Sequence, residues 1–289
     1  MVGAGADGAG AGVEEFDHAG EFGEVDLAVI AGVGGVPGHG DDGRGNYDQR
    51  YEGNGFSRND HGDHGYDDPG QGGKGHADCA PDDCGADGIG DSVFAPKVER
   101  LLDKIFGEEI VNNAEEFYFA DVKPLPGFTA NGKVLMAFDD DTDTLTVVVA
   151  ARDIEANMPH LQHIHGFTDN TTDATSPTLA QDDDGDGIVE LAEGLATYGP
   201  ILLNLTAPPG SGLGGFPVAD ADGTYFFRET YQLPFELLPG NPQLTLREIV
   251  LHGQTLAEGQ GFNGGEADGT AGFKVVLPVS SGEIQNITA

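Results

Sequence analysis

The sequence predicts an all-β domain over residues 93–289, a Greek-key β-sandwich or flattened barrel, preceded by a disordered acidic segment over residues 1–92. Two observations predict the β domain. After residue 107, apolar residues alternate with polar ones in short runs, as strands with one buried face require. Gly, Pro and Asp separate these runs, and seven or eight short strands with such turns are typical of sandwiches and barrels.

The expected strands begin with a β-hairpin, because two alternating runs flank an acidic turn at residues 140–143. A short run of aromatic and small residues ahead of them is expected to add an edge strand at residues 117–120. The other expected strands cover residues 133–139, 144–151, 161–167, 200–206, 224–233, 244–252 and 272–279.

One helix is expected, within residues 93–107. Pro96 suits the first turn of a helix, and Gly107 directly follows the last apolar residues and ends it. The apolar residues between them follow the helical spacing i, i+3, i+4, i+7: Val98, Leu101, Leu102 and Ile105. We expect a short amphipathic helix that caps the β domain.

Residues 1–92 have the composition of a disordered segment. Gly and Asp dominate, and large apolar residues are too sparse to offset the entropy cost of ordering the chain. Five scattered histidines are expected to be solvated, with weak metal binding as the alternative: His18, His39, His61, His64 and His76. Cys79 and Cys84 can close a small disulfide loop or remain free thiols, and the spacing leaves both alternatives open.

The charge of the chain limits its partners. The formal net charge is -37, from 50 acidic and 13 basic residues. A chain without a basic patch is a poor ligand for nucleic acid, whereas a charge this negative favours calcium, other metal ions or a salty medium. No membrane span is expected, because the apolar stretch at residues 25–36 is short and rich in glycine. The first residues also lack the features of a signal peptide.

Residues 182–193 read DDDGDGIVELAE and resemble the calcium loop of an EF-hand at all twelve positions. Gly187 stands at position 6, where the chain turns sharply. The expected calcium ligands are Asp182, Asp184, Asp186, the carbonyl of Ile188, Glu190 and Glu193. A metal-free acidic turn is the alternative.

A paired EF-hand domain is not expected around this loop. The residues before it are rich in Thr, Ser and Pro, which predicts no preceding helix, and Gly194 follows where an exiting helix usually carries an apolar residue. The loop is therefore interpreted as a single calcium site with a structural role, which orders a long connection between strands.

Three histidines form a second candidate site. His163 and His165 are two residues apart on an expected strand, so their side chains point to the same face. His252 lies on another expected strand, and three imidazoles can hold copper or zinc, with His160 as a possible fourth ligand. The alternative is that these histidines only pack and form hydrogen bonds within the β domain.

A family resemblance supports the copper hypothesis. Residues 163–170 (HIHGFTDN) resemble the copper-ligand strand of Cu/Zn superoxide dismutases, whose pattern is close to H-V-H-x-F-G-D-N. Residues 247–252 (REIVLH) resemble that family's R-x-x-V-V-H strand, and residues 269–274 its G-N-A-G-x-R turn. The resemblance spans roughly residues 130–285. It implies a superoxide dismutase-like fold with copper at His163, His165 and His252, and Lys274 guiding the anion.

The chain also departs from that family. Residues 171–196 contain no histidine, so the bridging and zinc ligands are missing, and no cysteine occurs in 130–285. The run HIHG, followed later by GEI at residues 282–284, is similar to chordin-type (CHRD) domains as well. These are β-sandwich modules of secreted proteins with no assigned catalysis, which implies a secreted, cell-surface or periplasmic location.

Two functions follow from these patterns. The first is an extracellular, calcium-stabilised β-sandwich module with a binding or structural role and no intact catalytic centre. Its partners would be metal ions and extracellular matrix or surface components. The second is a mononuclear copper-binding protein or a superoxide dismutase-like enzyme that uses His163, His165 and His252, with Lys274 attracting superoxide.

Overall fold

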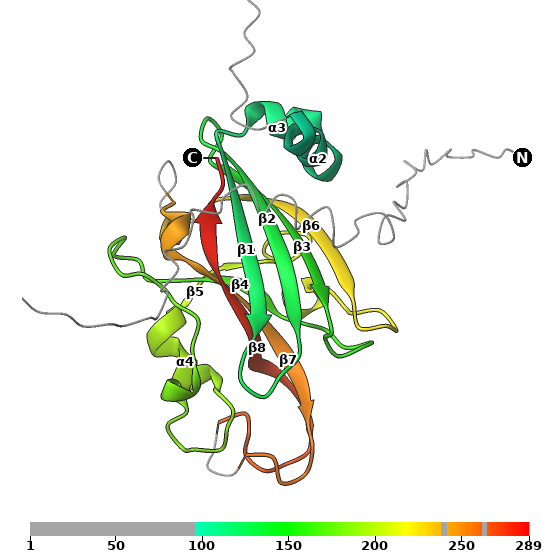
Figure 1. The fold of residues 1–289 in the computed structure, drawn as a ribbon, viewed down its shortest axis with the longest axis vertical. Helices are drawn as coiled ribbons and strands as arrows, with labels where there is room; N and C mark the ends of the chain where they lie inside the picture. Colours follow the sequence, from blue (N-terminus) through cyan, green and yellow to red (C-terminus); the bar gives the residue numbers. More distant parts are fainter. Residues whose placement is uncertain (1–95, 238–241, 262–264, 289) are drawn as a thin grey trace, which may run out of the picture. The chain divides into compact units, whose positions relative to one another are not determined.

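The computed structural model describes residues 96–237, 242–261 and 265–288. The segment predicted to be disordered, with its five histidines and two cysteines, lies outside the described residues. The described part is mostly β-structure, arranged as one curled antiparallel sheet of eight strands in the order β5-β4-β7-β8-β1-β2-β3-β6 (Figure 1). The strands are β1 (Glu116–Pro124), β2 (Asn131–Asp139), β3 (Thr144–Arg152), β4 (Gln162–His165), β5 (Ile201–Asn204), β6 (Tyr225–Gln232), β7 (Glu248–Leu256) and β8 (Gly272–Asn286).

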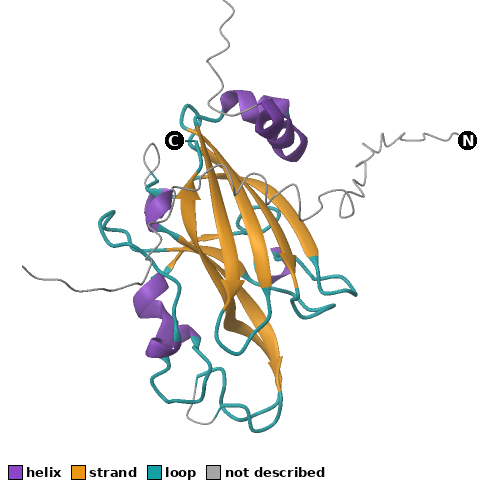
Figure 2. Cartoon of the chain, in the orientation of Figure 1, coloured by secondary structure: helices purple, strands orange, loops and turns teal. Residues whose placement is uncertain are grey.

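Helices are short and lie outside the sheet (Figure 2). They are the α-helices α2 (Pro96–Phe106), α3 (Glu108–Asn113) and α4 (Leu191–Tyr198), and the 3₁₀ turns η1 (Leu179–Gln181), η2 (Leu213–Gly215), η3 (Phe235–Leu237) and η4 (Leu244–Leu246). The helix expected within residues 93–107 is confirmed as α2, and it ends at Gly107, which has a φ of 86°. Within the described ranges, no helix is long and apolar enough to cross a membrane.

All eight expected strands form, but three differ clearly from the sequence-based expectation. The strand expected at residues 272–279 is longer, because β8 continues to Asn286 and pairs with β1 there. The segment at 117–120 is not an edge strand, because β1 pairs with β8 on one side and β2 on the other. The strand expected from residue 244 begins later, at Glu248, because residues 244–246 form the turn η4.

The core fills the inside of the curled sheet, and every strand contributes to it. One buried apolar residue from each of the eight strands illustrates this: Tyr118, Val134, Val147, Ile164, Leu202, Phe227, Leu251 and Val279. On the other face of β1 and β2, Phe117, Phe119 and Leu135 pack against Leu102 and Phe106 of α2. Both faces of β1 are therefore buried.

Candidate metal centres

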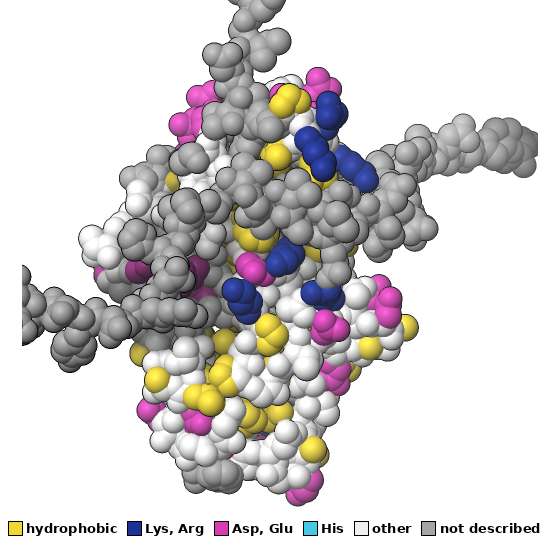
Figure 3. All heavy atoms as spheres, viewed as in Figure 1, with side chains coloured by type: hydrophobic (Ala, Val, Ile, Leu, Met, Phe, Trp, Pro, Cys, Tyr) yellow, Lys and Arg dark blue, Asp and Glu magenta, His cyan; other side chains and the backbone are white. Residues whose placement is uncertain are grey.

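Strand pairing brings the three histidines together. His163 and His165 lie on β4, which pairs antiparallel with β7, the strand that carries His252. The pairing of β7 with β8 shifts register at His252, as at a β-bulge, which redirects the side chains there. All three histidines are buried, with 3%, 1% and 1% of their surface exposed. No histidine is visible on the described surface that Figure 3 shows.

The three imidazole rings pack against one another, and each has one buried nitrogen without a hydrogen-bond partner among the described residues. One nitrogen from each ring lies within 4.8 Å of the other two. Within the described residues, the buried ring nitrogens that lack a hydrogen-bond partner are Nδ1 of His163, Nε2 of His165 and Nε2 of His252. Metal–nitrogen bonds of about 2.0–2.1 Å place the nitrogens of a three-coordinate site roughly 3.5 Å apart, so a small inward movement closes the group around one ion.

The backbone fixes the orientation of two rings. Nδ1 of His165 lies 2.8 Å from the carbonyl oxygen of Gly199, and Nδ1 of His252 lies 2.7 Å from that of Val276. A carbonyl oxygen only accepts, so each Nδ1 carries the proton and each Nε2 presents its lone pair to the cluster. This is the arrangement that orients histidine ligands in metal sites.

Burial keeps the three imidazoles neutral. It lowers the pKa of His163 to about 2, with His252 and His165 lowering it further. Burial also lowers the pKa of His165 to about 4, and burial together with His165 lowers that of His252 to about 3. Neutral imidazole is the form that binds metal, so at pH 7 no proton has to leave before an ion binds.

His160 does not complete the site as a fourth ligand. Its Nδ1 lies 3.0 Å from the carbonyl oxygen of His252, and its Nε2 lies 2.8 Å from that of Glu155. Both ring nitrogens therefore face backbone acceptors, and His160 is not part of the three-nitrogen group among the described residues. Its buried ring supports the backbone at His252 instead.

Lys274 is occupied by an ion pair. Its ammonium lies 2.8 Å from a carboxylate oxygen of Asp268 and 3.0 Å from the hydroxyl of Thr270. Lys274 lies on β8, two residues before Val276, whose carbonyl orients His252. The role expected for Lys274 in guiding an anion stays a prediction, and the neutralising Asp268 weakens it.

The second candidate site is the carboxylate loop, residues 182–193. It begins directly after the 3₁₀ turn η1, and its last three residues form the first turn of α4. Asp182, Asp184 and Glu193 each place one oxygen within 4.8 Å of the others. The turn expected at Gly187 is confirmed by its φ of 90°.

Backbone amides hold these carboxylates in place. The Asp182 carboxylate accepts from the N–H groups of Gly185 at 2.7 Å and Gly187 at 2.9 Å. The Glu193 carboxylate accepts from Asp183 at 2.8 Å and from Glu190 at 2.9 Å. These oxygens keep further lone pairs, so the loop can still bind a hard cation.

Asp186 and Glu190 differ in how they relate to this group. Desolvation raises the pKa of Asp186, and the neighbouring charges of Asp184, Asp182 and Glu193 raise it further, which shows that Asp186 adjoins the cluster. Its buried Oδ2 lacks a partner in the described ranges. Glu190 instead accepts a 2.6 Å hydrogen bond from the amide of Ala267.

Ile188 anchors the loop through its side chain. It is 7% exposed and packs with Leu256, Ala267 and Leu277. Its amide donates to Asp186 at 2.7 Å. Calcium coordination by the Ile188 carbonyl, by Asp186 and by Glu190 stays a prediction, and the Glu190 bond to Ala267 is the observation that disfavours it for Glu190.

Sequence reasoning did not identify a buried carboxyl, Glu248, which lies opposite His165 in the β4–β7 pair. Its Oε1 accepts from the hydroxyls of Ser281, at 2.5 Å, and Ser176. Its Oε2 has no partner within the described residues, and burial raises its pKa to about 7. The sequence feature that could have identified Glu248 is its position as a single acidic residue at the start of an apolar strand.

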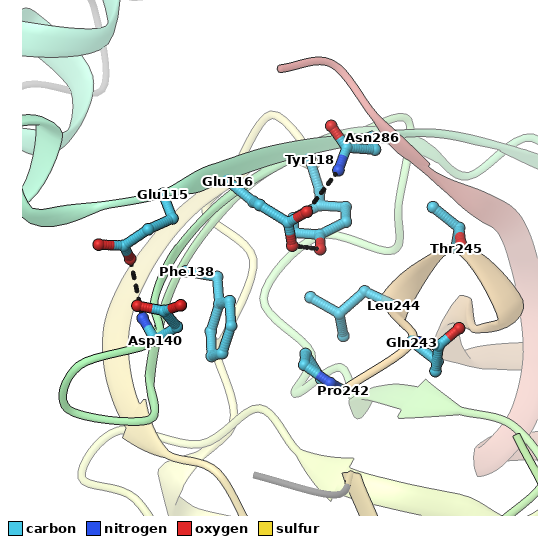
Figure 4. A pocket seen from close by; sticks show the side chains of 10 residues that line it. All are labelled: Glu115, Glu116, Tyr118, Phe138, Asp140, Pro242, Gln243, Leu244, Thr245 and Asn286. Atoms are coloured by element: carbon cyan, nitrogen blue, oxygen red, sulfur yellow. Dashed lines mark hydrogen bonds between the residues drawn. The ribbon is translucent and has the colours of Figure 1, made fainter. Parts of the chain in front are cut away.

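A surface cleft lies elsewhere on the sheet (Figure 4). Its volume is about 300 Å³, and its lining comes from β1, β2, the end of β8 and the η4 region. Glu115 and Glu116 lie at this cleft together with Tyr118, whose hydroxyl donates to Glu116. None of the candidate metal ligands lines it.

A scan against protein-family models found no match for this chain, and a search of curated proteins found no similar sequence.

Proposed function

We propose that this chain is a metal-binding β domain in which His163, His165 and His252 hold one copper ion, while the carboxylate loop binds calcium and stabilises the fold. The observation that carries the proposal is the convergence of the three buried histidines, each of which places one ring nitrogen within 4.8 Å of the others. Each histidine also has one buried ring nitrogen without a hydrogen-bond partner among the described residues. The proposal includes an extracellular setting and a superoxide dismutase-like or CHRD-like Greek-key β-sandwich.

Energetics favour a metal over packing alone. A buried polar atom that loses its hydrogen bond costs roughly 1–3 kcal/mol, and the cluster contains three such nitrogens. Buried histidines that only pack normally have hydrogen-bond partners, and both ring nitrogens of His160 lie within hydrogen-bond distance of backbone oxygens. A bound ion supplies the missing partner for all three nitrogens at once.

The ligand set favours copper over other divalent ions. Three neutral imidazoles suit copper and zinc, and copper is the ion that nitrogen ligands bind most strongly in the first-row series. Zinc is the competing ion. Calcium and magnesium prefer oxygen ligands, which this cluster does not offer, so the two candidate sites are expected to select different metals.

The experiment is a competition titration with a coloured copper chelator, on the wild-type chain and on His165→Ala. We expect the wild-type chain to bind one copper ion. His165→Ala should lower the affinity for copper by more than the ~10–100-fold that is lost when a residue hydrogen-bonded to a metal ligand is removed. His160→Gln is the matched control, because His160 is equally buried but lies outside the cluster. Thermal unfolding of this variant verifies that it is folded. Absence of copper and zinc binding by the wild type would overturn the proposal.

A second candidate function is superoxide dismutation. Three protein ligands leave a coordination position open, which is the arrangement that catalytic metal sites use. The test compares superoxide turnover by copper-loaded wild type and Asp268→Asn, in which the partner of Lys274 loses its charge. A dismutase guided by Lys274 gains activity from this change. A copper-loaded chain without turnover in either form leaves copper binding as the function.

A further inference from the structure

We infer that helix α4 couples the two metal sites, so that calcium in the carboxylate loop raises the affinity of the histidine cluster for copper. This inference rests on the proposed function, because it requires that both sites bind metal. Its basis is that the two ends of this one short helix each contact a different site.

The first turn of α4 belongs to the carboxylate loop. Glu193, the third residue of the helix, contributes one of the three converging carboxylate oxygens. Its other contacts are to backbone amides of the loop itself, at Asp183 and Glu190. An ion that draws Asp182, Asp184 and Glu193 together therefore fixes the start of the helix.

The last turn of α4 belongs to the histidine cluster. The carbonyl of Gly199, directly after the helix, accepts the 2.8 Å hydrogen bond from Nδ1 of His165. The ring of Tyr198 lies against the ring of His165, with centroids 4.8 Å apart. These two contacts set the direction in which Nε2 of His165 points, so Tyr198 and Gly199 are positioning residues for a metal ligand.

The helix is built to move as one unit. Tyr198 is fully buried, and its hydroxyl donates to the carbonyl of Leu191 in the first turn at 2.9 Å. A Cβ at Gly194 would lie 2.4 Å from the Tyr198 ring, so only glycine lets the ring lie along the helix. At 1.5 Å per residue, Glu193 and Gly199 are roughly 9 Å apart along the axis, a distance that such a braced segment spans without a hinge.

The far end of the helix is also fixed to the strand that carries His165. A Cβ at Gly199 would lie 2.6 Å from the carbonyl oxygen of Gly166, and the φ of 76° at Gly199 favours glycine as well. The amide of Gly166 donates to the carbonyl of Pro200 at 3.1 Å. A displacement of α4 therefore reaches His165 through the neighbouring backbone and through the ring of Tyr198.

The test measures a thermodynamic cycle on the full chain. Copper affinity is titrated with and without saturating calcium, in buffers freed of metal by resin, and calcium affinity is titrated with and without copper. We expect calcium to raise copper affinity about tenfold, and copper to raise calcium affinity by the same factor, because linkage is reciprocal. A purely structural calcium site without coupling would leave both affinities unchanged.

Two variants sharpen the test. Glu193→Gln is expected to lose the calcium effect and to bind copper at the calcium-free affinity of the wild type. Asp141→Asn, an exposed carboxylate in the β2–β3 turn, is the control and should keep the full effect. If both metals bind the wild type and neither changes the affinity for the other, the coupling is overturned while the proposed function stands. If either metal fails to bind, both are overturned.

Discussion

The two candidate metal sites, the histidine cluster and the carboxylate loop, are built in opposite ways. The histidines come from two strands that are far apart in sequence and are buried, and backbone carbonyls orient two of the three rings. The carboxylates come from twelve consecutive residues and are partly exposed. Desolvation raises the pKa of Asp186, and the charges of its acidic neighbours raise it further, whereas hydrogen bonds from backbone amides lower the pKa of Asp182. Long-range strand pairing therefore positions the cluster, whereas the loop positions its own carboxylates through local backbone amides.

The largest expected effect tests the burial of the histidines. Their pKa values of about 2, 4 and 3 lie below the ordinary 6.5, so the unfolded chain binds protons that the folded chain does not. Stability of the metal-free chain is fully present above pH 6.5 and is lost as pH falls. For each pH unit below 6.5, each histidine lowers the free energy of unfolding by about 1.4 kcal/mol. The three histidines together lower it by about 4 kcal/mol per pH unit.

Urea unfolding of the metal-free chain at several pH values between 5 and 7 provides the measurement. The variant with all three histidines changed to Gln is the control, since it lacks these titrations and should show a shallower dependence on pH. Equal slopes for the two proteins would mean that the three imidazoles are solvated, and the contrast with the loop would disappear.

A carboxylate in the buried setting of the histidines should show the opposite sign. The pKa of Glu248 is raised from 4.5 to about 7, so the folded chain holds a proton that the unfolded chain has released. Its stabilising contribution is present below pH 4.5 and is lost as pH rises through 7. We expect Glu248→Gln to gain up to about 3 kcal/mol over wild type by pH 8.

Denaturant unfolding of both proteins at pH 5 and pH 8 measures this gain. Glu229→Gln, a change at a partly exposed position on β6, controls for the loss of one charge and should show no such dependence on pH. A stability difference between wild type and Glu248→Gln that stays constant with pH would show that Glu248 is ionised in the folded chain throughout.

The carboxylate loop is expected to show a moderate, calcium-dependent effect. A ligand that binds only the folded chain at a hundredfold excess over Kd stabilises it by about 2.7 kcal/mol. Asp182→Asn combined with Glu193→Gln should remove this gain, because both residues belong to the converging group. The measurement is the melting temperature with and without calcium. A wild-type melting temperature that does not change when calcium is added would contradict the structural role of the loop.

The smallest expected effect concerns residues 1–92. Since their composition offers little apolar surface to bury, their deletion should leave cooperative unfolding of the β domain unchanged within about 0.5 kcal/mol. Calorimetry of the full and truncated chains compares the two. A truncated chain that unfolds gradually would place part of the folding core before residue 93.

Local patterns explain why strands and the carboxylate loop were predictable. Alternation and turn residues are properties of neighbouring positions, and the twelve loop positions are consecutive, so Asp182 and Glu193 could be paired from sequence alone. The convergence of His163 and His165 with His252 required a family resemblance, because strand order depends on the whole sheet.

Features fixed by tertiary contacts were not predictable. Gly194 stands where the helix after an EF-hand loop usually carries an apolar residue, so no such helix was expected. Helix α4 forms nevertheless, and the ring of Tyr198 packs over that glycine. Glu190 matched a ligand position, but its carboxylate bonds to Ala267, which is distant in sequence. His160 was a candidate ligand because it is a histidine close in sequence to His163. In the fold, its ring nitrogens face two backbone carbonyls instead.

The decisive measurement is elemental analysis of the chain after copper and calcium loading and gel filtration. We predict one copper and one calcium per wild-type chain. His163→Ala combined with His165→Ala should lose the copper alone, and Asp182→Asn combined with Glu193→Gln should lose the calcium alone. Copper that stays bound to the double histidine variant at the wild-type ratio would contradict the assignment of the buried cluster as the transition-metal site.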